Sequence, residues 1–182
     1  EILIGGIPIK ELNLNSLRKA ISVVPQENFL FSDTILNNLR FGNKEASEEQ
    51  IIEACQKAVV HNNIIEFTHQ YNSLLGERGV SLSGGQRQRV AIARALLKKT
   101  EIYLLDDCLS AVDTDTEEKI LTNLRDTLKG KTVIIVSHRI SITKYADKIL
   151  MLDKGKLVEQ GTKEELLAQN GVFKAFYDTQ TI

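Results

Sequence analysis

Two neighbouring aspartates, Asp106 and Asp107, come directly after the apolar run "IYLL" at 102–105. Ligands of open α/β sheets bind beyond the carboxyl ends of the strands, so acids at this position are well placed for chemistry. An aspartate there can hold Mg²⁺, usually through water, against nucleotide phosphates. A second acid can orient or deprotonate an attacking water. The alternative is a solvated strand end followed by a turn, and these residues alone leave both interpretations open.

The segment "SLSGGQRQR" at 81–89 has the composition of a phosphate-binding helix start. Ser83 and Gln86 have the spacing of a capping box, which predicts Ser83 as the N-cap. Gly84 and Gly85 add no bulk to the first turn, so backbone N–H groups could approach an anion closely. The alternative is a tight turn into a helix without a ligand. The arginines later in the segment are more typical of a solvated face than of a nucleic-acid contact.

Two further polar residues come after strand-like runs. His138 comes just after "TVIIVS", and an imidazole there can bond a phosphate oxygen. Gln26 comes after "ISVVP", where its amide could reach a metal ion or a water. A lone histidine is more often structural, and a lone glutamine is a weak signal. Neither residue decides the function alone.

One expected phosphate-binding element is absent from the sequence. No G-x-x-x-x-G-K-[ST] occurs in the 182 residues, although this loop normally cradles nucleotide phosphates. The chain also begins with Glu1 and enters a strand-like pattern at once. We therefore expect this sequence to be a piece of a longer protein.

The apolar pattern predicts the elements that position these residues. Strands are predicted where β-branched and apolar residues run together, at 2–4, 21–24, 102–105, 132–136 and 149–152. The runs "IYLL" and "TVIIV" are apolar at consecutive positions, which is typical of parallel strands buried on both faces.

Helices are predicted between the strands. One covers 47–60, where Ser47 and Gln50 again have capping-box spacing, and another covers 114–128. The tail predicts two short helices separated at Asn170–Gly171. Residues 27–98 look almost wholly helical. We therefore predict an α/β core formed by 1–26 and 99–182, with a helical insert at 27–98.

Composition narrows the class of protein. The chain has 42% hydrophobic and 26% charged residues, which is ordinary for a soluble globular protein. The net charge of −1 argues against nucleic acid or an anionic membrane surface as the main partner. No apolar run approaches the roughly 18 residues of a membrane span. Cys55 and Cys108 form no C-x-x-C pair, which favours a reducing environment without a cysteine metal site.

Taken together and in this order, the motifs resemble the nucleotide-binding domain of ATP-binding cassette (ABC) proteins, most closely that of ABC exporters. The segment "LSGGQRQ" resembles the family signature, "IYLLDD" the Walker B strand and "SAVD" the D-loop. "SHR" resembles the H-loop, "VPQ" the Q-loop and "GERG" the exporter segment that couples to transmembrane helices. The tail "VEQGTKEELL" also fits, so the resemblance covers essentially the whole chain.

The resemblance implies a P-loop NTPase (RecA-like) parallel-sheet core with an inserted α-helical subdomain, incomplete here without the Walker A loop. It implies two ATP molecules with Mg²⁺ between head-to-tail ABC domains, next to the transmembrane domain of an exporter at the cytoplasmic face of a membrane. Nucleic acid is not an expected partner. The resemblance implies that the partner's ATP is bound by Ser83, Gly84, Gly85 and Gln86. It implies that Asp106 binds Mg²⁺, that Asp107 is catalytic and that Gln26 senses the metal and the water. It also implies a γ-phosphate contact for His138 and interface contacts for Asp113 and Glu77.

The sequence departs from the family pattern at one position. Active members usually carry glutamate where this chain has Asp107, and the shorter side chain should draw the carboxylate back from the water. Heterodimeric exporters often pair one such degenerate site with a competent one, so the resemblance predicts a heterodimer. The chain alone should bind ATP poorly and hydrolyse none. The alternatives are a non-catalytic interaction module and a soluble ABC ATPase that acts on DNA or ribosomes.

Overall fold

The computed structural model describes residues 1–76 and 80–181. These residues form two compact units, Glu1–Val136 and Ser137–Ile182. The predicted division into 1–26 with 99–182 and an insert at 27–98 differs in kind, because it separates a core from a helical insert. It stays a prediction.

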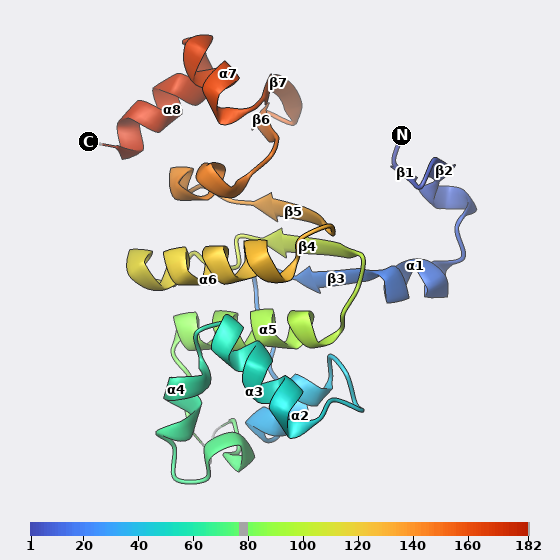
Figure 1. Ribbon diagram of the computed structural model, residues 1–182, viewed down its shortest axis with the longest axis vertical. Helices are drawn as coiled ribbons and strands as arrows, with labels where there is room; N and C mark the ends of the chain where they lie inside the picture. The colour runs from blue at the N-terminus through green and yellow to red at the C-terminus, as the bar shows by residue number, and fades with distance from the viewer. Residues whose placement is uncertain (77–79, 182) are drawn as a thin grey trace. The chain divides into compact units, whose positions relative to one another are not determined.

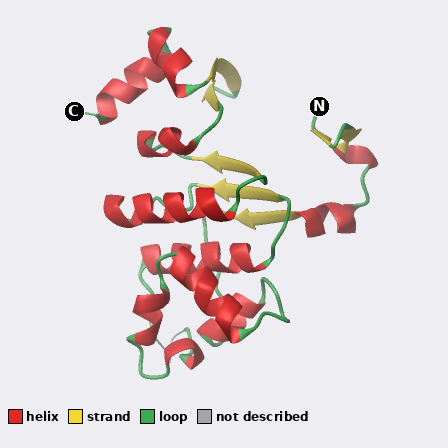
Figure 2. Ribbon diagram, viewed as in Figure 1, coloured by secondary structure: helices red, strands yellow, loops and turns green. Residues whose placement is uncertain are grey.

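The first unit is built on a parallel sheet of three strands. The strands β3 (Ile21–Val24), β4 (Ile102–Asp106) and β5 (Thr132–Val136) lie in the order β3-β4-β5. All run in the same direction, as Figure 2 shows. Their bounds confirm the strands predicted from the apolar runs, and with the surrounding helices they confirm the α/β class.

Helices account for most of the rest of this unit. They are α1 (Leu14–Ala20), α2 (Ile35–Arg40), α3 (Glu48–Lys57), α4 (His61–Ile65), α5 (Gly84–Leu97) and α6 (Thr114–Thr127), with short 3-10 turns η1 (Ile9–Glu11) and η2 (Gln70–Asn72). The helix α5 packs against β3, α2 and α3, and Figure 1 shows it between the sheet and those two helices. The predicted helices at 47–60 and 114–128 are confirmed, the first with an earlier end.

The stretch between β3 and β4 is less helical than the sequence predicts. Asn38 accounts for one of the loops in this stretch, because its side chain forms hydrogen bonds with the backbone of the loop and not with solvent. Its Oδ1 accepts from the Phe31 N–H at 2.8 Å, and its Nδ2 donates to the Phe31 carbonyl at 3.1 Å. These bonds fix the chain before α2 as an irregular loop, as side chains that compete with helical hydrogen bonds commonly do.

The two faces of the parallel sheet differ in burial. Tyr103 and Leu105 of β4 are each 3% exposed, on the face that α5 covers. On the other face, the cross-strand neighbours of Leu104 are about half exposed, with Val23 at 55% and Ile134 at 52%. The prediction that "TVIIV" is buried on both faces is therefore wrong. The reason is that β5 is an edge strand, and the described helices pack on only one face.

The start of the chain forms a small hairpin of its own. Strand β1 (Leu3–Ile4) pairs antiparallel with β2 (Ile7–Pro8). Gly5 and Gly6 connect them with φ of +58° and +82°, which glycine adopts without strain and which suits a two-residue hairpin turn. The strand predicted at 2–4 exists, but it pairs locally and not with the parallel sheet.

The second unit contains an antiparallel hairpin and three helical segments. They are β6 (Ile149–Asp153), β7 (Lys156–Gly161), the 3-10 helix η3 (Ile140–Tyr145), α7 (Lys163–Ala168) and α8 (Val172–Gln180). The core consists of Ile140, Ile149, Leu166 and Phe173. The predicted strand at 149–152 is confirmed, and the tail divides into two helices at Asn170, whose φ is +52°. The polar strand β7 was not predicted.

Candidate functional site

The start of α5 is closed by the capping box that the sequence predicts. The Ser83 Oγ accepts from the Gln86 N–H at 3.2 Å, and the Gln86 Oε1 accepts from the Ser83 N–H at 2.9 Å. Ser83 is exposed, and the first turn contains no acidic residue. The remaining N–H groups and the helix dipole favour an anion at this end.

The two glycines of this turn serve different purposes. A Cβ on Gly85 would lie 2.6 Å from the carbonyl oxygen of Ala111, a contact that backbone cannot relieve cheaply. A Cβ on Gly84 would lie 3.4 Å from the Ala111 Cβ, which is ordinary packing. Close approach of the loop 107–113 therefore requires glycine at position 85, whereas packing does not require it at position 84.

The acidic residues lie where β4 ends. Asp106 is the last residue of the strand and is exposed, while Asp107 is half-buried and has a φ of +44°. The Asp107 N–H donates to the Val136 carbonyl at 2.9 Å, so the loop starts as a continuation of the strand pairing. Left-handed backbone is uncommon for a residue other than glycine, and neighbouring bonds must hold it.

Gln26 belongs to the same edge of the sheet as the acids. Val24 is the register partner of Leu105, so Gln26 and Asp107 each lie two residues beyond this register pair, at the same end of two neighbouring parallel strands. The Gln26 side chain is exposed. Carboxylate and amide oxygens are the hard donors that Mg²⁺ prefers, with water completing its coordination. The donor set fits this ion, although the described residues contain no ready cluster of three ligating side chains.

Asp113 closes the loop at the start of α6. Its Oδ1 accepts from the Thr116 N–H at 2.9 Å, and this bond holds the pKa of the Asp113 carboxyl below its usual range. Asp113 is exposed, so its carboxylate is open to solvent as well as capping the helix. This position is compatible with its predicted interface role, which stays a prediction.

Two predicted residues remain, His138 and Glu77. His138 belongs to the second unit, where its side chain is exposed and its carbonyl accepts from the Gln180 Nε2 at 2.8 Å. Its predicted contact with phosphate stays a prediction. Glu77 lies outside the described residues.

Sequence reasoning missed Gln88, which joins the start of α5 to the acidic loop. Its side chain is 6% exposed and bonds two residues of that loop, Ser110 and Ala111. One signal was available. Gly85, Gln88 and Ile92 have the spacing of a buried helix face, and a glutamine in such a stripe needs polar partners.

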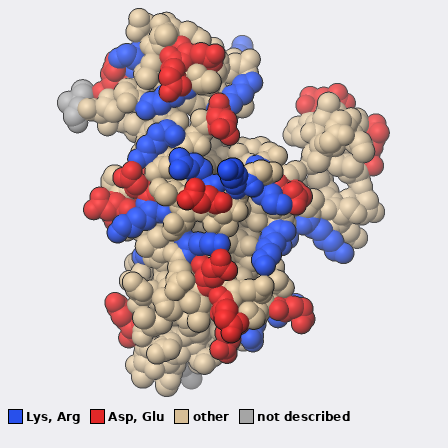
Figure 3. Space-filling model, in the orientation of Figure 1, with Lys and Arg blue, Asp and Glu red and all other residues tan. Residues whose placement is uncertain are grey.

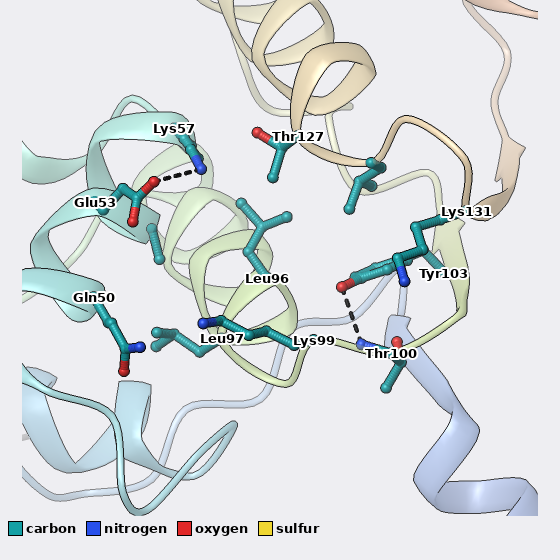
Figure 4. Close-up of a pocket in the computed structure, with 12 residues that line it drawn as sticks. Gln50, Glu53, Lys57, Leu96, Leu97, Lys99, Thr100, Tyr103, Thr127 and Lys131 are labelled. Carbon is teal, nitrogen blue, oxygen red and sulfur yellow. Dashed lines mark hydrogen bonds and ion pairs between the residues drawn. The ribbon is translucent and has the colours of Figure 1, made fainter.

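A cavity of this unit lies at the opposite end of the sheet. It has a volume of about 320 Å³ and lies where β4 and β5 begin, between the ends of α3, α5 and α6. Figure 4 shows two interactions among its polar groups: Lys57 is paired to Glu53 at 2.7 Å, and the Thr100 N–H is bonded to the Tyr103 hydroxyl at 3.2 Å. None of the predicted site residues lines it.

Charge and hydropathy of the described residues add two observations. On the face in Figure 3, basic and acidic side chains are interspersed and do not gather into a large region of one sign. Within 1–76 and 80–181, no helix has the length and apolar character needed to cross a bilayer.

Comparison with known proteins gives the family of this chain. Residues 1–110 match the ABC transporter family. An ABC transporter ATP-binding protein of Bacillus subtilis, YknU, is 49% identical over 98% of this chain, which spans 31% of that relative. An ATP-dependent lipid A-core flippase of Legionella pneumophila is 46% identical over 98% of this chain, which spans 30% of that protein.

A solved structure agrees with this result. A bacterial Atm1-family ABC exporter with ATP bound matches 99% of this chain with a TM-score of 0.94 and 40% identity, and the match covers 32% of the exporter chain. The chain therefore belongs to the ABC transporter family. It spans about a third of the length of these relatives.

Proposed function

We propose that this chain is part of the ATP-hydrolysing domain of a membrane exporter and works at an interface with a second ABC domain. The observation that carries the proposal is the start of α5, which is capped, lined by glycines and free of acidic residues. It is packed against the loop that comes after two strand-end aspartates. An anion grip beside acids is suited to binding MgATP and attacking it with water.

Each residue has a role in this proposal. Asp106 would hold Mg²⁺, which neutralises charge on the phosphates. Asp107 orients the water that attacks the γ-phosphorus, and the bond to the β,γ-bridging oxygen breaks to release ADP and phosphate. Gln26 lies beyond the neighbouring strand and contacts the same water or the metal. His138 contacts the γ-phosphate.

The grip at the start of α5 serves the ATP of the partner domain. Ser83, Gly84, Gly85 and Gln86 contact its γ-phosphate, while Asp113 meets the partner across the interface. Because the start of α5 binds the partner's ATP and not the chain's own, a chain without G-x-x-x-x-G-K-[ST] can still carry this phosphate-binding helix start. By itself, the 182-residue chain would not turn over ATP, because it lacks the lysine and amides of that loop.

An exposed aromatic cluster supports a transmembrane partner at the cytoplasmic face of the membrane. Phe29 and Phe41 are each 66% exposed, and each has its ring centroid 5.0 Å from that of Phe31. The Arg94 guanidinium lies 5.9 Å from the Phe41 centroid and donates to the Phe29 carbonyl at 3.1 Å. Apolar groups held rigidly in solvent are typical of an interface. We assign this cluster, with the segment around Glu77, to the coupling helices of the exporter.

The test uses the full-length protein with its transmembrane domain and partner ABC domain. The wild type should hydrolyse MgATP, and Asp106→Ala should abolish turnover at the site built on this chain. Glu101→Ala is the control, because Glu101 lies at the other end of β4 and pairs with Lys131. A wild type without turnover, or Asp106→Ala with full turnover at its own site, would contradict the proposal.

A substitution at Asp107 tests whether this chain contributes the degenerate site of a heterodimer. A carboxylate misplaced by about 1 Å can cost roughly 100-fold in rate, so Asp107→Glu should raise turnover at this chain's own site by about 10- to 100-fold. Single-turnover measurements would separate the two sites. An unchanged rate, with a partner that carries its own glutamate, would place the degeneracy elsewhere in the site.

A further inference from the structure

We propose that Gln88 is a positioning residue for ATP hydrolysis, which holds the backbone of the acidic loop against the start of α5. The inference rests on the proposed function, because it assigns Asp107 to the attacking water. It adds a structural connection within one chain. The start of α5, which binds the partner's ATP, is linked to Asp106 and Asp107 of the chain's own site.

The connection begins with both ends of one amide. The Gln88 Nε2 donates to the Ser110 Oγ at 2.9 Å, and the Gln88 Oε1 accepts from the Ala111 N–H at 3.0 Å. An amide side chain can make both bonds at once, because its nitrogen donates and its oxygen accepts. Because Gln88 is 6% exposed, water cannot readily replace either bond.

Ser110 links Gln88 to the backbone of Asp107. The Ser110 Oγ donates to the Asp107 carbonyl at 3.0 Å. Asp107 has a φ of +44°, which costs free energy unless its surroundings hold it. Its N–H is bonded to the Val136 carbonyl and its carbonyl to Ser110, so the peptide on each side is fixed. Loss of the bond from Gln88 would remove one restraint on the Ser110 hydroxyl and so weaken its hold on the Asp107 carbonyl.

Packing reinforces the same contact one helical turn earlier. Gly85 and Gln88 are three residues apart and share a face of α5. Gly85 lets the Ala111 carbonyl approach the helix, and Gln88 bonds the N–H of the same residue. A displacement of the first turn of α5, where the partner's phosphate binds, therefore has to move the loop or break these contacts.

Three substitutions test the two bonds of the amide. Gln88→Met keeps the volume and removes both bonds. Gln88→Glu keeps the bond to the Ala111 N–H but presents an acceptor to Ser110, whose hydroxyl then donates to the glutamate in place of the Asp107 carbonyl. Ser110→Ala removes the relay and keeps the Ala111 bond. All three variants therefore weaken the hold on the Asp107 carbonyl, which keeps only the bond from the Ser110 N–H at 3.3 Å, and they leave the predicted phosphate contacts unchanged.

The control is Asn123→Leu. The Asn123 Nδ2 donates to the Lys57 carbonyl at 3.0 Å and so ties α6 to the end of α3, away from the acids. Its loss should lower the melting temperature of the protein as much as the Gln88 variants do, without changing turnover.

The experiment measures kcat and KM for MgATP with the full-length protein and its partner. We expect the three variants to lower kcat at this chain's site by about 10- to 100-fold, with KM changed by less than about threefold. Gln88→Glu and Ser110→Ala should not add in the double variant, because they break one relay. An unchanged kcat with an active wild type would overturn the inference alone, whereas an inactive wild type would overturn the proposed function as well.

A second readout does not depend on activity. Cys108 lies in the loop and is 2% exposed, while Cys55 lies on α3 and is 0% exposed. Release of the loop should speed alkylation of Cys108 by about fivefold, the equivalent of roughly one hydrogen bond, and leave Cys55 unchanged. Equal rates at Cys108 in the wild type and in Gln88→Met would contradict a positioning role.

Discussion

Two helices of the first unit, α3 and α5, begin with the same local chemistry. Ser47 and Gln50 form a capping box at the start of α3, with bonds of 3.1 and 3.3 Å, and Ser83 and Gln86 form one at the start of α5. Both serines are exposed and both glutamines are half-buried. The capping box therefore does not distinguish a ligand site from an ordinary helix start.

The two helices differ in the residues of the first turn, directly after the cap. The first turn of α3 carries Glu48 and Glu49. Hydrogen bonds from the Ser47 hydroxyl and from the Glu49 backbone N–H hold the pKa of the Glu49 carboxyl below its usual range. The chain thus supplies its own anion to α3. At α5 the corresponding turn has glycines and no acid. A helix start becomes a candidate anion site when the chain leaves its positive end without a carboxylate.

The largest effect is expected at Gly85. Gly85→Ala places a methyl group 2.6 Å from the Ala111 carbonyl oxygen, so it should cost about 1–3 kcal/mol of unfolding free energy and disrupt the loop. Turnover should fall by about 100-fold or more. Gly84→Ala is the matched control. It should retain stability, so any loss of turnover there reports on phosphate binding and not on packing. Chemical denaturation and ATPase assays check both.

A smaller effect is expected from the caps themselves. Ser83→Ala and Ser47→Ala should each cost about 1 kcal/mol of unfolding free energy, because each removes an N-cap. Only Ser83→Ala should also weaken ATP turnover by the site that this chain completes. Equal turnover in the two variants would mean that the start of α5 is no more than a helix cap.

An added charge sharpens the same comparison. Gln86→Glu and Gln50→Glu both keep a capping box, and each acid should stabilise its helix by about 0.3–1 kcal/mol. At α5 the new carboxylate repels phosphate, so KM for MgATP should rise by about five- to tenfold at low salt. The α3 variant should leave KM unchanged. The same KM for both variants would contradict phosphate binding at α5.

A pH effect is expected at two buried cysteines, Cys55 of α3 and Cys108 of the loop against the start of α5. Burial raises the pKa of the Cys55 and Cys108 thiols to about 12. The unfolded thiols ionise near pH 8.5, so their contribution to stability is complete below that pH and is lost as the pH rises towards 12. Cys55→Ala should therefore flatten the loss of stability between about pH 8.5 and 11. Urea unfolding across this range measures the slope, and an unchanged slope would contradict the shift.

The sequence predicts the elements whose signals are local. The caps of α3 and α5, the three parallel strands and the break at Asn170 each depend on residues close together in the chain. The exposed face of β5 was not predicted, because apolar residues on consecutive positions do not reveal how many layers cover a sheet. Strand β7 was missed because a polar strand such as "KLVEQG" lacks an apolar pattern.

The site shows the same division. The capped start of α5 and the position of Asp106 at the end of β4 can be predicted from the local sequence. Gln88 could not be assigned, because its partners Ser110 and Ala111 lie more than 20 residues away. The pairing of a helix face with a distant loop depends on tertiary packing, which a single sequence does not display.

Disulfide cross-linking between two ABC domains tests the central claim most directly. Ser83→Cys in this chain would be combined with a cysteine in the G-x-x-x-x-G-K-[ST] loop of the partner domain, both in full-length protein, and Ser47→Cys would serve as the matched control. The account predicts a cross-link to Ser83→Cys that depends on MgATP, and none to Ser47→Cys. No cross-link at position 83, or equal cross-linking at both positions, would contradict the claim that α5 grips the partner's nucleotide.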